Sequence, residues 1–548
     1  MKPTGKNLVL SAIEGNKTDR IPWVPFCGVH SGKLIGKTAT EFLKSSGLIV
    51  EGLSKAVELY RPDGIPVCFD LQIEAEILGC DLTWSNENPP AVTSHPLTEG
   101  KFKLEDLKIP SVSDGRLPVI LEATEKLRKK YPDLALYGLI TGPFTLALHL
   151  LGTEIFMGMF DRPEYIKKVL SFCADVGNKL SEMYVGKGCD IIAVVDPMTS
   201  QIGPDQFREF CLVPSIKIFD HIKTLGAKGS FFVCGHAQNN ISVMCDCHCD
   251  NISIDENIPL DFVKEICRNK GVSFGGNMKL TTVMLLGSPE DNKINAVECM
   301  QIGGNEGFIL APGCDMPYDT PEKNVMAIAD VVHDKYQREI AEELAGKQHG
   351  GDTACLLDMS EYGMAEKVII DIITLDSEAC APCQYMVESV KAVVPEFGDL
   401  IVWREHKIKS HDAITMMSSL YVRNIPTICI DGQIKFVSRI PPKEELIKAI
   451  QERIREKFSL KIQYNRGKII LLGDPDDEKF ATIRENIHLA IRELGSTIDF
   501  SEITDEKEIR KYGVFSTPAV VTEKYTVKST GKITDKNIIK EWIKALNE

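Results

Sequence analysis

Two cysteines with a two-residue spacer, Cys380 and Cys383, form the pair in this chain best suited to chemistry. The pair follows a β-rich run, Lys367–Leu375, and a helical pattern continues from about Gln384, which places Cys380 at the first turn of a helix after a strand. There the helix dipole and the free backbone N–H groups stabilise a thiolate, which lowers the pKa of the first cysteine. The second cysteine then closes a reversible disulfide by exchange. We therefore predict a redox-active dithiol. The alternative is that these two cysteines supply half of the ligands of a zinc site, although this region has no second cysteine pair with suitable spacing.

The sequence around this pair, IIDIITLDSEACAPC followed by Asn424-Ile-Pro-Thr427 and TICIDGQIKF, resembles the thioredoxin family. The resemblance implies that Cys380 is the attacking thiol and Cys383 the resolving one. It also implies that Pro426 follows a cis peptide bond and faces the dithiol. The tryptophan that usually precedes the first cysteine is Ala379 here, so the redox potential stays open.

The C-terminal residues repeat the same order of elements, with a strand at Gly467–Leu472, a helix at Glu478–Leu494 and a strand at Ala519–Thr522. A proline loop before that last strand ends at Pro518, and the whole resembles a second thioredoxin-like domain. Asp474-Pro-Asp-Asp477 stands where the cysteine pair would be. Since carboxylates cannot exchange disulfides, we expect this domain to be redox-inactive and to act as a docking or spacer unit.

Before the dithiol, from Met1 to about Arg338, apolar runs alternate with amphipathic helical patterns such as Pro163–Met183 and Pro259–Arg268. The apolar runs are Leu134–Thr141, Cys189–Val195, Ala227–Cys234, Ile252–Asp255, Val272–Gly276 and Gly307–Ala311. This alternation predicts a parallel α/β fold, and the length favours a (β/α)8 TIM barrel with an N-terminal helical extension. We divide the chain into a barrel (1–338), a linker (339–365), a thioredoxin-like domain with the dithiol (366–457) and a degenerate thioredoxin-like domain (458–548).

Motifs in the first 338 residues add a resemblance that covers nearly all of this segment. They are Thr18-Asp-Arg-Ile-Pro22, CFDLQIEAEILGCDLTW, GLITGPFTLALHLLG, VVDPMTSQIGPDQFREF, FFVCGH, ISIDEN and GFILAPGCDMPYDTPEKN. In this order they resemble the uroporphyrinogen decarboxylase superfamily, which implies a TIM barrel. The decarboxylases hold substrate carboxylates with an arginine-rich N-terminal segment, whereas the corresponding Val24–Ser31 contains no arginine. The better resemblance is to the branch of zinc-dependent, corrinoid-linked methyltransferases.

That branch carries a His-x-Cys at the end of one strand and a distant cysteine at the end of the last. Soft thiolates hold zinc, and an open coordination position lets a substrate thiol bind as the thiolate that attacks a cobalt-bound methyl group. By this resemblance the ligands are Cys234 and Cys314, while Phe232 replaces the histidine. His236 could supply a nitrogen from the other side of Cys234. We predict Zn2+ at Cys234, His236 and Cys314; a site that has lost its metal or uses another ligand is the alternative.

Three carboxylates beside predicted strand ends are further candidates by the same resemblance. Glu74 and Asp196 are candidate proton acceptors or outer-shell partners, and Asp255 is a candidate for lining the corrinoid or zinc pocket. A helix cap or a loop hydrogen bond is the alternative for each. Cys245-Asp-Cys-His-Cys249 is interpreted as a thiol-rich element near the barrel, with a soft-metal or auxiliary thiol site as the alternative.

Charge and composition narrow the partners. With 63 basic and 78 acidic residues the net charge is −15, which disfavours nucleic acid and anionic membrane surfaces. No apolar run reaches the ~18 residues that span a bilayer, so we expect a cytoplasmic protein. The 17 cysteines are irregularly spaced in a long chain, which favours reduced, metal-binding or redox-active thiols over a secreted disulfide scaffold. No glycine-rich phosphate motif follows a strand, so we predict no nucleotide.

The leading hypothesis is a methyltransferase that moves a methyl group from a methylated corrinoid protein to a small thiol acceptor. The corrinoid (methylcobalamin-like) arrives on a partner, since no Asp-x-His-x-x-Gly signature for binding it is present. The dithiol would keep the acceptor or the barrel thiols reduced, or serve a thiol/disulfide partner. A thiol–disulfide oxidoreductase whose barrel is only a binding module is the alternative. A third hypothesis is a decarboxylase that acts on a tetrapyrrole without a metal.

Overall fold

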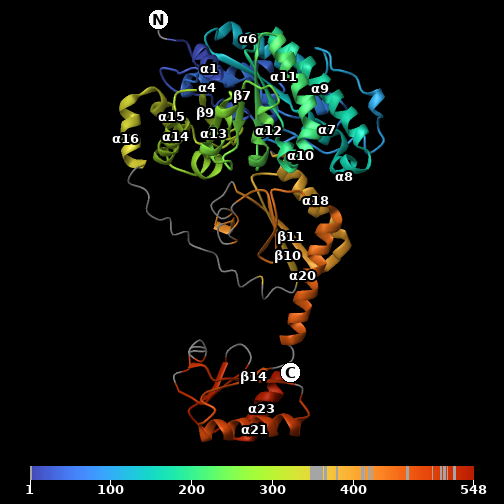
Figure 1. Cartoon of the computed structure of the whole chain (residues 1–548), viewed down its shortest axis with the longest axis vertical. Helices are drawn as coiled ribbons and strands as arrows, with labels where there is room; N and C mark the ends of the chain where they lie inside the picture. The colour runs from blue at the N-terminus through green and yellow to red at the C-terminus, as the bar shows by residue number, and fades with distance from the viewer. Residues whose placement is uncertain are drawn as a thin grey trace. The chain divides into compact units, whose positions relative to one another are not determined.

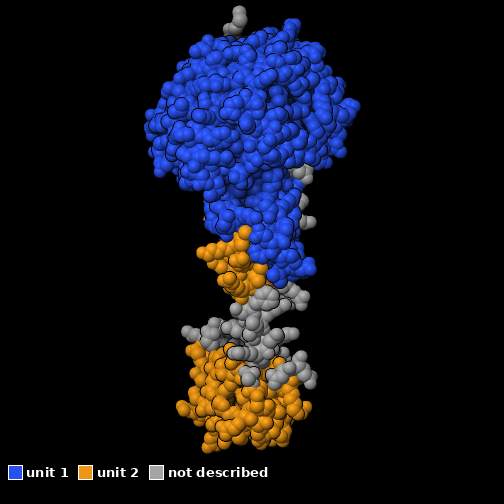
Figure 2. All heavy atoms as spheres, turned by 90° about the vertical axis from the view of Figure 1, so that its right-hand side faces the viewer, with its two compact units in different colours: residues 1–446 blue, residues 447–548 orange. Residues whose placement is uncertain are grey.

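The computed structural model divides the chain into two compact units, Met1–Leu446 and Ile447–Glu548 (Figure 2). It describes residues 3–345, 362, 367–377, 380–408, 413, 415–417, 420, 422, 424–464, 468–496, 498–506, 509, 514, 516–522 and 526–547.

The first unit is built around a curled sheet in which every neighbouring pair of strands is parallel. Its strands, in spatial order, are β1 (Gly64–Pro66), β4 (Ala135–Thr141), β5 (Ile191–Val195), β6 (Lys228–Val233), β7 (Asn251–Ile254), β8 (Ser273–Met278) and β9 (Phe308–Pro312). The extended segment at Trp23 lies between the two edges. Val24 N–H donates to the Leu310 carbonyl (3.0 Å), and Asp63 N–H donates to the Trp23 carbonyl (2.8 Å). This segment takes the place of an eighth strand, and the predicted TIM-barrel fold is confirmed.

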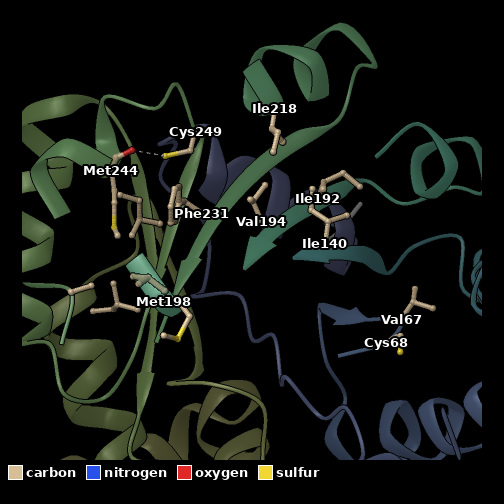
Figure 3. Packing of buried hydrophobic residues seen from close by; sticks show 14 of the residues in the cluster. Val67, Cys68, Ile140, Ile192, Val194, Met198, Ile218, Phe231, Met244 and Cys249 are labelled. Atoms are coloured by element: carbon tan, nitrogen blue, oxygen red, sulfur yellow. Dashed lines mark hydrogen bonds between the residues drawn. The ribbon is translucent and has the colours of Figure 1, made fainter. Parts of the chain in front are cut away.

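Helices surround this sheet and bury its outer face (Figure 1). The longer ones are α1 (Gly5–Ile13), α4 (Ser46–Tyr60), α6 (Leu117–Lys130), α9 (Pro163–Gly186), α11 (Leu212–Thr224), α13 (Leu260–Lys270), α14 (Pro289–Gly303) and α15 (Glu322–His333). Figure 3 shows Ile218 of α11 above Val194 of β5, and both are fully buried. Because the inner face is filled by side chains as well, the strands are buried along almost their whole length, and β4, β5 and β9 are continuous apolar runs in the sequence. β6, β7 and β8 include buried polar residues such as Ser230, Asn251 and Asn277.

Shorter elements lie in the connections of the barrel. They are α2 (His30–Lys33), α3 (Ala39–Leu43), α5 (Ile73–Ile77), α7 (Pro143–Leu151), α8 (Glu154–Asp161), α10 (Pro204–Gln206), α12 (Ile241–Cys245) and the hairpin of β2 (Leu82–Thr83) with β3 (Ala91–Val92). No single described helix is long and apolar enough to cross a membrane. The pair α7 and α8, bent by 102°, passes that test by length and composition only.

The dithiol domain in the same unit has the strand order β11-β10-β12-β13. Its elements are β10 (Val368–Thr374), α18 (Ala381–Phe397), β11 (Ile401–Lys407), β12 (Thr427–Ile430), β13 (Gln433–Val437) and α20 (Lys443–Tyr464), which continues into the second unit. β10 is parallel to β11 and antiparallel to β12. Asp431 and Gly432 have positive φ angles of 47° and 75°, the conformation that a tight hairpin turn requires. The Ile425–Pro426 peptide bond is cis, and the predicted thioredoxin-like topology is confirmed.

The second unit repeats this topology with the order β15-β14-β16-β17. Its elements are β14 (Lys468–Leu472), α21 (Glu478–Leu494), β15 (Asp499–Ile503), β16 (Ala519–Thr522), β17 (Thr526–Thr530) and α23 (Lys536–Asn547). Asp477 is the N-cap of α21, because its carboxylate accepts the Lys479 N–H at 2.8 Å. The acidic segment that stands in place of a dithiol therefore has a structural role at the start of a helix.

The predicted linker, 339–365, begins inside α16 (Lys335–Ala345). Nearly all of the remainder of that linker lies outside the described residues, as does Ala379.

Candidate functional site

A pair of cysteines marks the carboxyl end of the barrel. Cys234 comes directly after β6 and Cys314 follows β9, so both lie where the loops of a TIM barrel form its active site. Their Sγ atoms are 2.9 Å apart although the two residues are 80 positions apart in sequence. The contact with Cys314 and burial together raise the pKa of the Cys234 thiol. The structure thus brings together the two predicted sulfur ligands.

The predicted third ligand does not join them. Phe232 packs inside the barrel against Phe26 and Phe69, with ring centroids 5.0 and 5.7 Å away. The Nε2 atom of His236 is buried and finds no hydrogen-bond partner among the described residues. Among these residues no group of three or more His, Cys, Asp or Glu side chains could hold a metal ion. A catalytic zinc takes three protein ligands, so the residues as arranged supply two of them and His236 is not the third.

The two sulfurs line a cavity of about 120 Å³ that the barrel and the dithiol domain enclose together. On the barrel side its wall includes Val29, Phe69, Gln72, Cys234, Asp255, Glu256, Cys314, Asp315 and Tyr318. On the other side it includes Leu375, Asp376, Cys380, Ala381, Pro382, Cys383, Ile425 and Pro426. A space of this volume admits a few water molecules or a small ligand, since drug-sized molecules occupy pockets of about 300 Å³ or more.

The dithiol sits at the start of α18 as the sequence predicted. Cys380 is the N-cap residue and is half-buried, and Cys383, in the first turn, is buried. The backbone N–H of Cys383 lowers the pKa of the Cys380 thiol, in the direction expected of a helix N-terminus. The hydrogen bond with the Cys383 thiol and burial outweigh it and raise that pKa well above its ordinary value. In this arrangement the contact between the two thiols, more than burial, opposes the lowering expected from the helix N-terminus, and a lowered pKa of Cys380 stays a prediction.

Specific contacts hold α18 against the barrel. Tyr385 is fully buried, its hydroxyl lies 3.3 Å from Nδ1 of His149, and its ring lies 6.0 Å from that of His95. Burial lowers the pKa of His149 to about 3, so this imidazole is neutral at pH 7. The side-chain amide of Gln384 donates to the Val92 carbonyl at 2.6 Å. Sequence reasoning missed this interface, because a tyrosine in a helix is equally consistent with the core of its own domain.

Carboxyl groups surround the sulfur pair inside the cavity. Asp255 accepts the Asn257 N–H at 2.8 Å, and burial raises its pKa. Burial, with the Asp255 charge adding to it, raises the pKa of Glu256 to about 8. Asp315 accepts the Gly28 N–H at 2.7 Å, and burial raises its pKa well above the usual range. Glu256 and Asp315 were not predicted, although each directly follows a residue that was.

The other two predicted carboxylates are not among the described residues that line the cavity. Glu74 is buried and accepts the Thr141 N–H at 2.8 Å, and burial raises its pKa to about 7. Asp196 accepts the N–H groups of Phe144 (3.1 Å) and Thr145 (2.8 Å) at the start of α7, and burial raises its pKa to about 6. These are the loop and cap roles that the sequence left open as alternatives.

The thiol-rich segment 245–249 does not converge on one point. Cys249 Sγ donates to the Met244 carbonyl at 3.6 Å (Figure 3), and Cys247 Sγ donates to the Val243 carbonyl at 3.7 Å. His248 points outward and is exposed. The arrangement favours the interpretation as a structural, thiol-rich element.

Comparisons with known proteins agree with this architecture. Residues 4–335 match the sequence model of the family described as uroporphyrinogen decarboxylase, and residues 479–544 match that of a thioredoxin domain. A methylcobamide:CoM methyltransferase (MtbA) of Methanosarcina acetivorans is 29% identical over 49% of this chain and 78% of its own length. The MtbA of Methanosarcina mazei is 27% identical over 60% of this chain and 97% of its own length. A solved methyltransferase structure from Methanosarcina mazei is 25% identical with a TM-score of 0.56, and it covers 62% of this chain and 99% of its own.

Proposed function

The chain belongs to the uroporphyrinogen decarboxylase family, and from that premise we propose that its barrel moves a methyl group from a corrinoid on a partner protein to a small thiol. The sulfur pair of Cys234 and Cys314 at the carboxyl end of the barrel carries this proposal. The similarity to methylcobamide:CoM methyltransferases over nearly their whole length supports it.

The reaction requires a thiolate and a place for its proton. The corrinoid supplies a cobalt-bound methyl group; the S–C bond forms as the Co–C bond breaks, and the electron pair of the broken bond stays on cobalt. Glu256 is the candidate for the proton transfer, because it lines the same cavity as the two sulfurs and burial raises its pKa toward that of a thiol. Val29 and Phe69 contribute apolar wall to the cavity that the two sulfurs line.

Zinc binding remains a prediction from the resemblance, and the proposed methyl transfer is described without it. Cys234 and Cys314 are the residues that would hold it, and the described residues add no third ligand to them. Metal analysis of the wild-type chain and of Cys314→Ser tests the prediction. One zinc per wild-type chain that the variant loses supports a metal centre, and no zinc in either leaves the sulfur pair to thiol chemistry alone.

Loss of methylcobalamin absorbance in the presence of small thiols tests methyl transfer directly. We expect the wild-type chain to demethylate methylcobalamin with at least one thiol, and Cys314→Ser to lose more than tenfold of that rate. Cys380→Ser is the matched control, since its cysteine lines the same cavity but belongs to the dithiol. With thiol in excess it should keep the wild-type rate. No turnover with any thiol, or equal turnover by Cys314→Ser, contradicts the proposal.

A thiol–disulfide oxidoreductase is the second candidate, and two observations favour it. Cys380 and Cys383 line the same cavity as the barrel sulfurs, and Phe232 stands in place of the zinc-binding histidine. This candidate expects reduction of small disulfides by the wild-type chain, loss of that activity in Cys380→Ser, and no demethylation of methylcobalamin.

A further inference from the structure

We propose that the dithiol of Cys380 and Cys383 acts on its own chain and exchanges electrons with the sulfur pair of Cys234 and Cys314. In this reaction the dithiol returns an oxidised barrel pair to two thiols. The proposal rests on the arrangement of four sulfurs and holds whether or not the barrel transfers methyl groups.

The four cysteines share one cavity. All four line it. Electrostatic repulsion from Cys380 contributes to the raised pKa of Cys234, and repulsion from Cys314 contributes to the raised pKa of Cys380. Among the cysteines that the structure describes, only Cys234, Cys314 and Cys380 are partly exposed, and the others are buried. The partly exposed thiols among the described residues thus all line one cavity.

The barrel pair is close to the geometry of a disulfide. The two Sγ atoms are 2.9 Å apart, so a movement of about 0.9 Å brings them to the ~2.05 Å of a sulfur–sulfur bond. Such a bond disables any function that needs the two thiols, whether metal binding or proton transfer. A reductant inside the same cavity would therefore restore the two thiols and the function that needs them.

Contacts that follow the dithiol in the chain hold its domain against the barrel. Gln384 bonds to Val92 next to the dithiol, and farther along the chain the Ile440 N–H donates to Oε1 of Gln201 at 3.0 Å. Tyr385, one turn into α18, is buried against the barrel. Since the two cysteine pairs are held in one cavity, their exchange is intramolecular and faster than reduction by a dilute external thiol.

The exchange balances with the groups present. The Cys380 thiolate attacks one sulfur of a Cys234–Cys314 disulfide, that bond breaks, and the released barrel thiolate takes up the proton that Cys380 gave up. Cys383 then attacks Cys380 in the mixed disulfide and frees the second barrel thiol, which takes the Cys383 proton. Two electrons and two protons move from the dithiol to the barrel pair. The barrel disulfide arises by reaction with an external disulfide or peroxide, and a small dithiol or a disulfide reductase regenerates Cys380 and Cys383.

Trapping the mixed disulfide tests the proposal. Cys383→Ser in the full chain removes the resolving thiol, so oxidation with glutathione disulfide should leave Cys380 bonded to Cys234 or Cys314. Peptide mass spectrometry without reduction identifies the bond. Cys429→Ser, which alters a buried cysteine of the same domain, is the matched control and should behave like the wild-type chain. Cys380 found only with glutathione, or bonded to a second chain, overturns the proposal.

The rate of reduction gives an independent readout. The wild-type chain and Cys380→Ser are oxidised, freed of oxidant and exposed to limiting dithiothreitol, and free Cys234 and Cys314 are counted by alkylation over time. We expect reduction of the barrel pair to be at least tenfold slower in Cys380→Ser. Equal rates overturn the proposal. Neither readout uses a corrinoid, so failure here is distinct from failure of methyl transfer.

Discussion

Protonation of Glu74 makes a separable contribution to the pH dependence of the stability of the barrel. The Oγ1 atom of Thr141 lies 2.8 Å from Glu74 Oε2 and 2.7 Å from the Leu71 carbonyl oxygen, yet a hydroxyl has one hydrogen to donate. A protonated Glu74 resolves the conflict: it donates to Thr141, and Thr141 donates to Leu71. Burial raises the pKa of Glu74 from 4.5 to about 7, in agreement with this arrangement.

The size and sign of the effect follow from that shift. A rise of the folded-state pKa from 4.5 to about 7 corresponds to about 3 kcal/mol of unfolding free energy. Because the folded state favours the protonated form, this stabilisation is fully present below pH 4.5 and is lost as the pH rises through 7. Glu74→Gln keeps the shape, accepts the Thr141 N–H and donates to the Thr141 hydroxyl, but does not titrate.

Urea unfolding of both chains at pH 5 and pH 8 measures the difference. Alkylation of Cys173, fully buried in α9, reports unfolding of the barrel alone. We expect the wild-type barrel to lose about 2 to 3 kcal/mol relative to Glu74→Gln between the two pH values, because a part of the stabilisation is already lost at pH 5. A difference that does not change with pH refutes the reasoning. Methylcobalamin demethylation at pH 7 separates the roles: a structural Glu74 predicts a rate within twofold of wild type, whereas a catalytic base predicts loss in the glutamine variant.

Three further substitutions probe single contacts. In Gly142→Ala the new Cβ meets Asp196 Cβ at 2.3 Å, so urea unfolding should show a barrel weakened by more than ~2 kcal/mol, and an unchanged midpoint contradicts the packing. Tyr385→Ala removes a buried ring from the interface between α18 and the barrel, at a cost of ~3 kcal/mol in packing free energy. Because the interface then opens more often, iodoacetamide should modify Cys380 at least tenfold faster, while the rate in Tyr385→Phe stays within twofold of wild type. Asp477→Ala removes a helix cap and should cost the second unit ~1 kcal/mol in thermal unfolding without weakening the barrel; equal loss in both units contradicts that assignment.

The parts of the fold that were predictable share one physical origin. The strands of the barrel are covered on both faces, so most of them appear in the sequence as apolar-rich runs, whereas the three-residue β1 (Gly64–Pro66) is too short to be recognised. Cys234 and Cys314 could be placed together because the carboxyl ends of parallel strands all lie at one end of a barrel. The hairpin at Asp431-Gly432 was predictable because few residue pairs tolerate its positive φ angles.

The parts that escaped prediction depend on contacts between distant segments. Trp23 closes the barrel through a few backbone hydrogen bonds to Leu310 and Asp63, too short a stretch to carry a periodic pattern. Glu256 and Asp315 belong to the site only because neighbouring loops bury them. The pKa of Cys380 was predicted from its helix alone, whereas the hydrogen bond with the Cys383 thiol, followed by burial, raises it.

Because methyl transfer and thiol–disulfide exchange would use the same cavity, the two proposed reactions cannot take place at the same time. A corrinoid ring is far larger than the cavity of about 120 Å³ that the barrel and the dithiol domain enclose. Methyl transfer to a thiol at Cys234 and Cys314 therefore requires the dithiol domain to move away, whereas exchange with Cys380 requires it to stay. If both proposals hold, the docked arrangement, in which Tyr385 is buried against the barrel, is the one that permits exchange, and weakening that contact should favour methyl transfer.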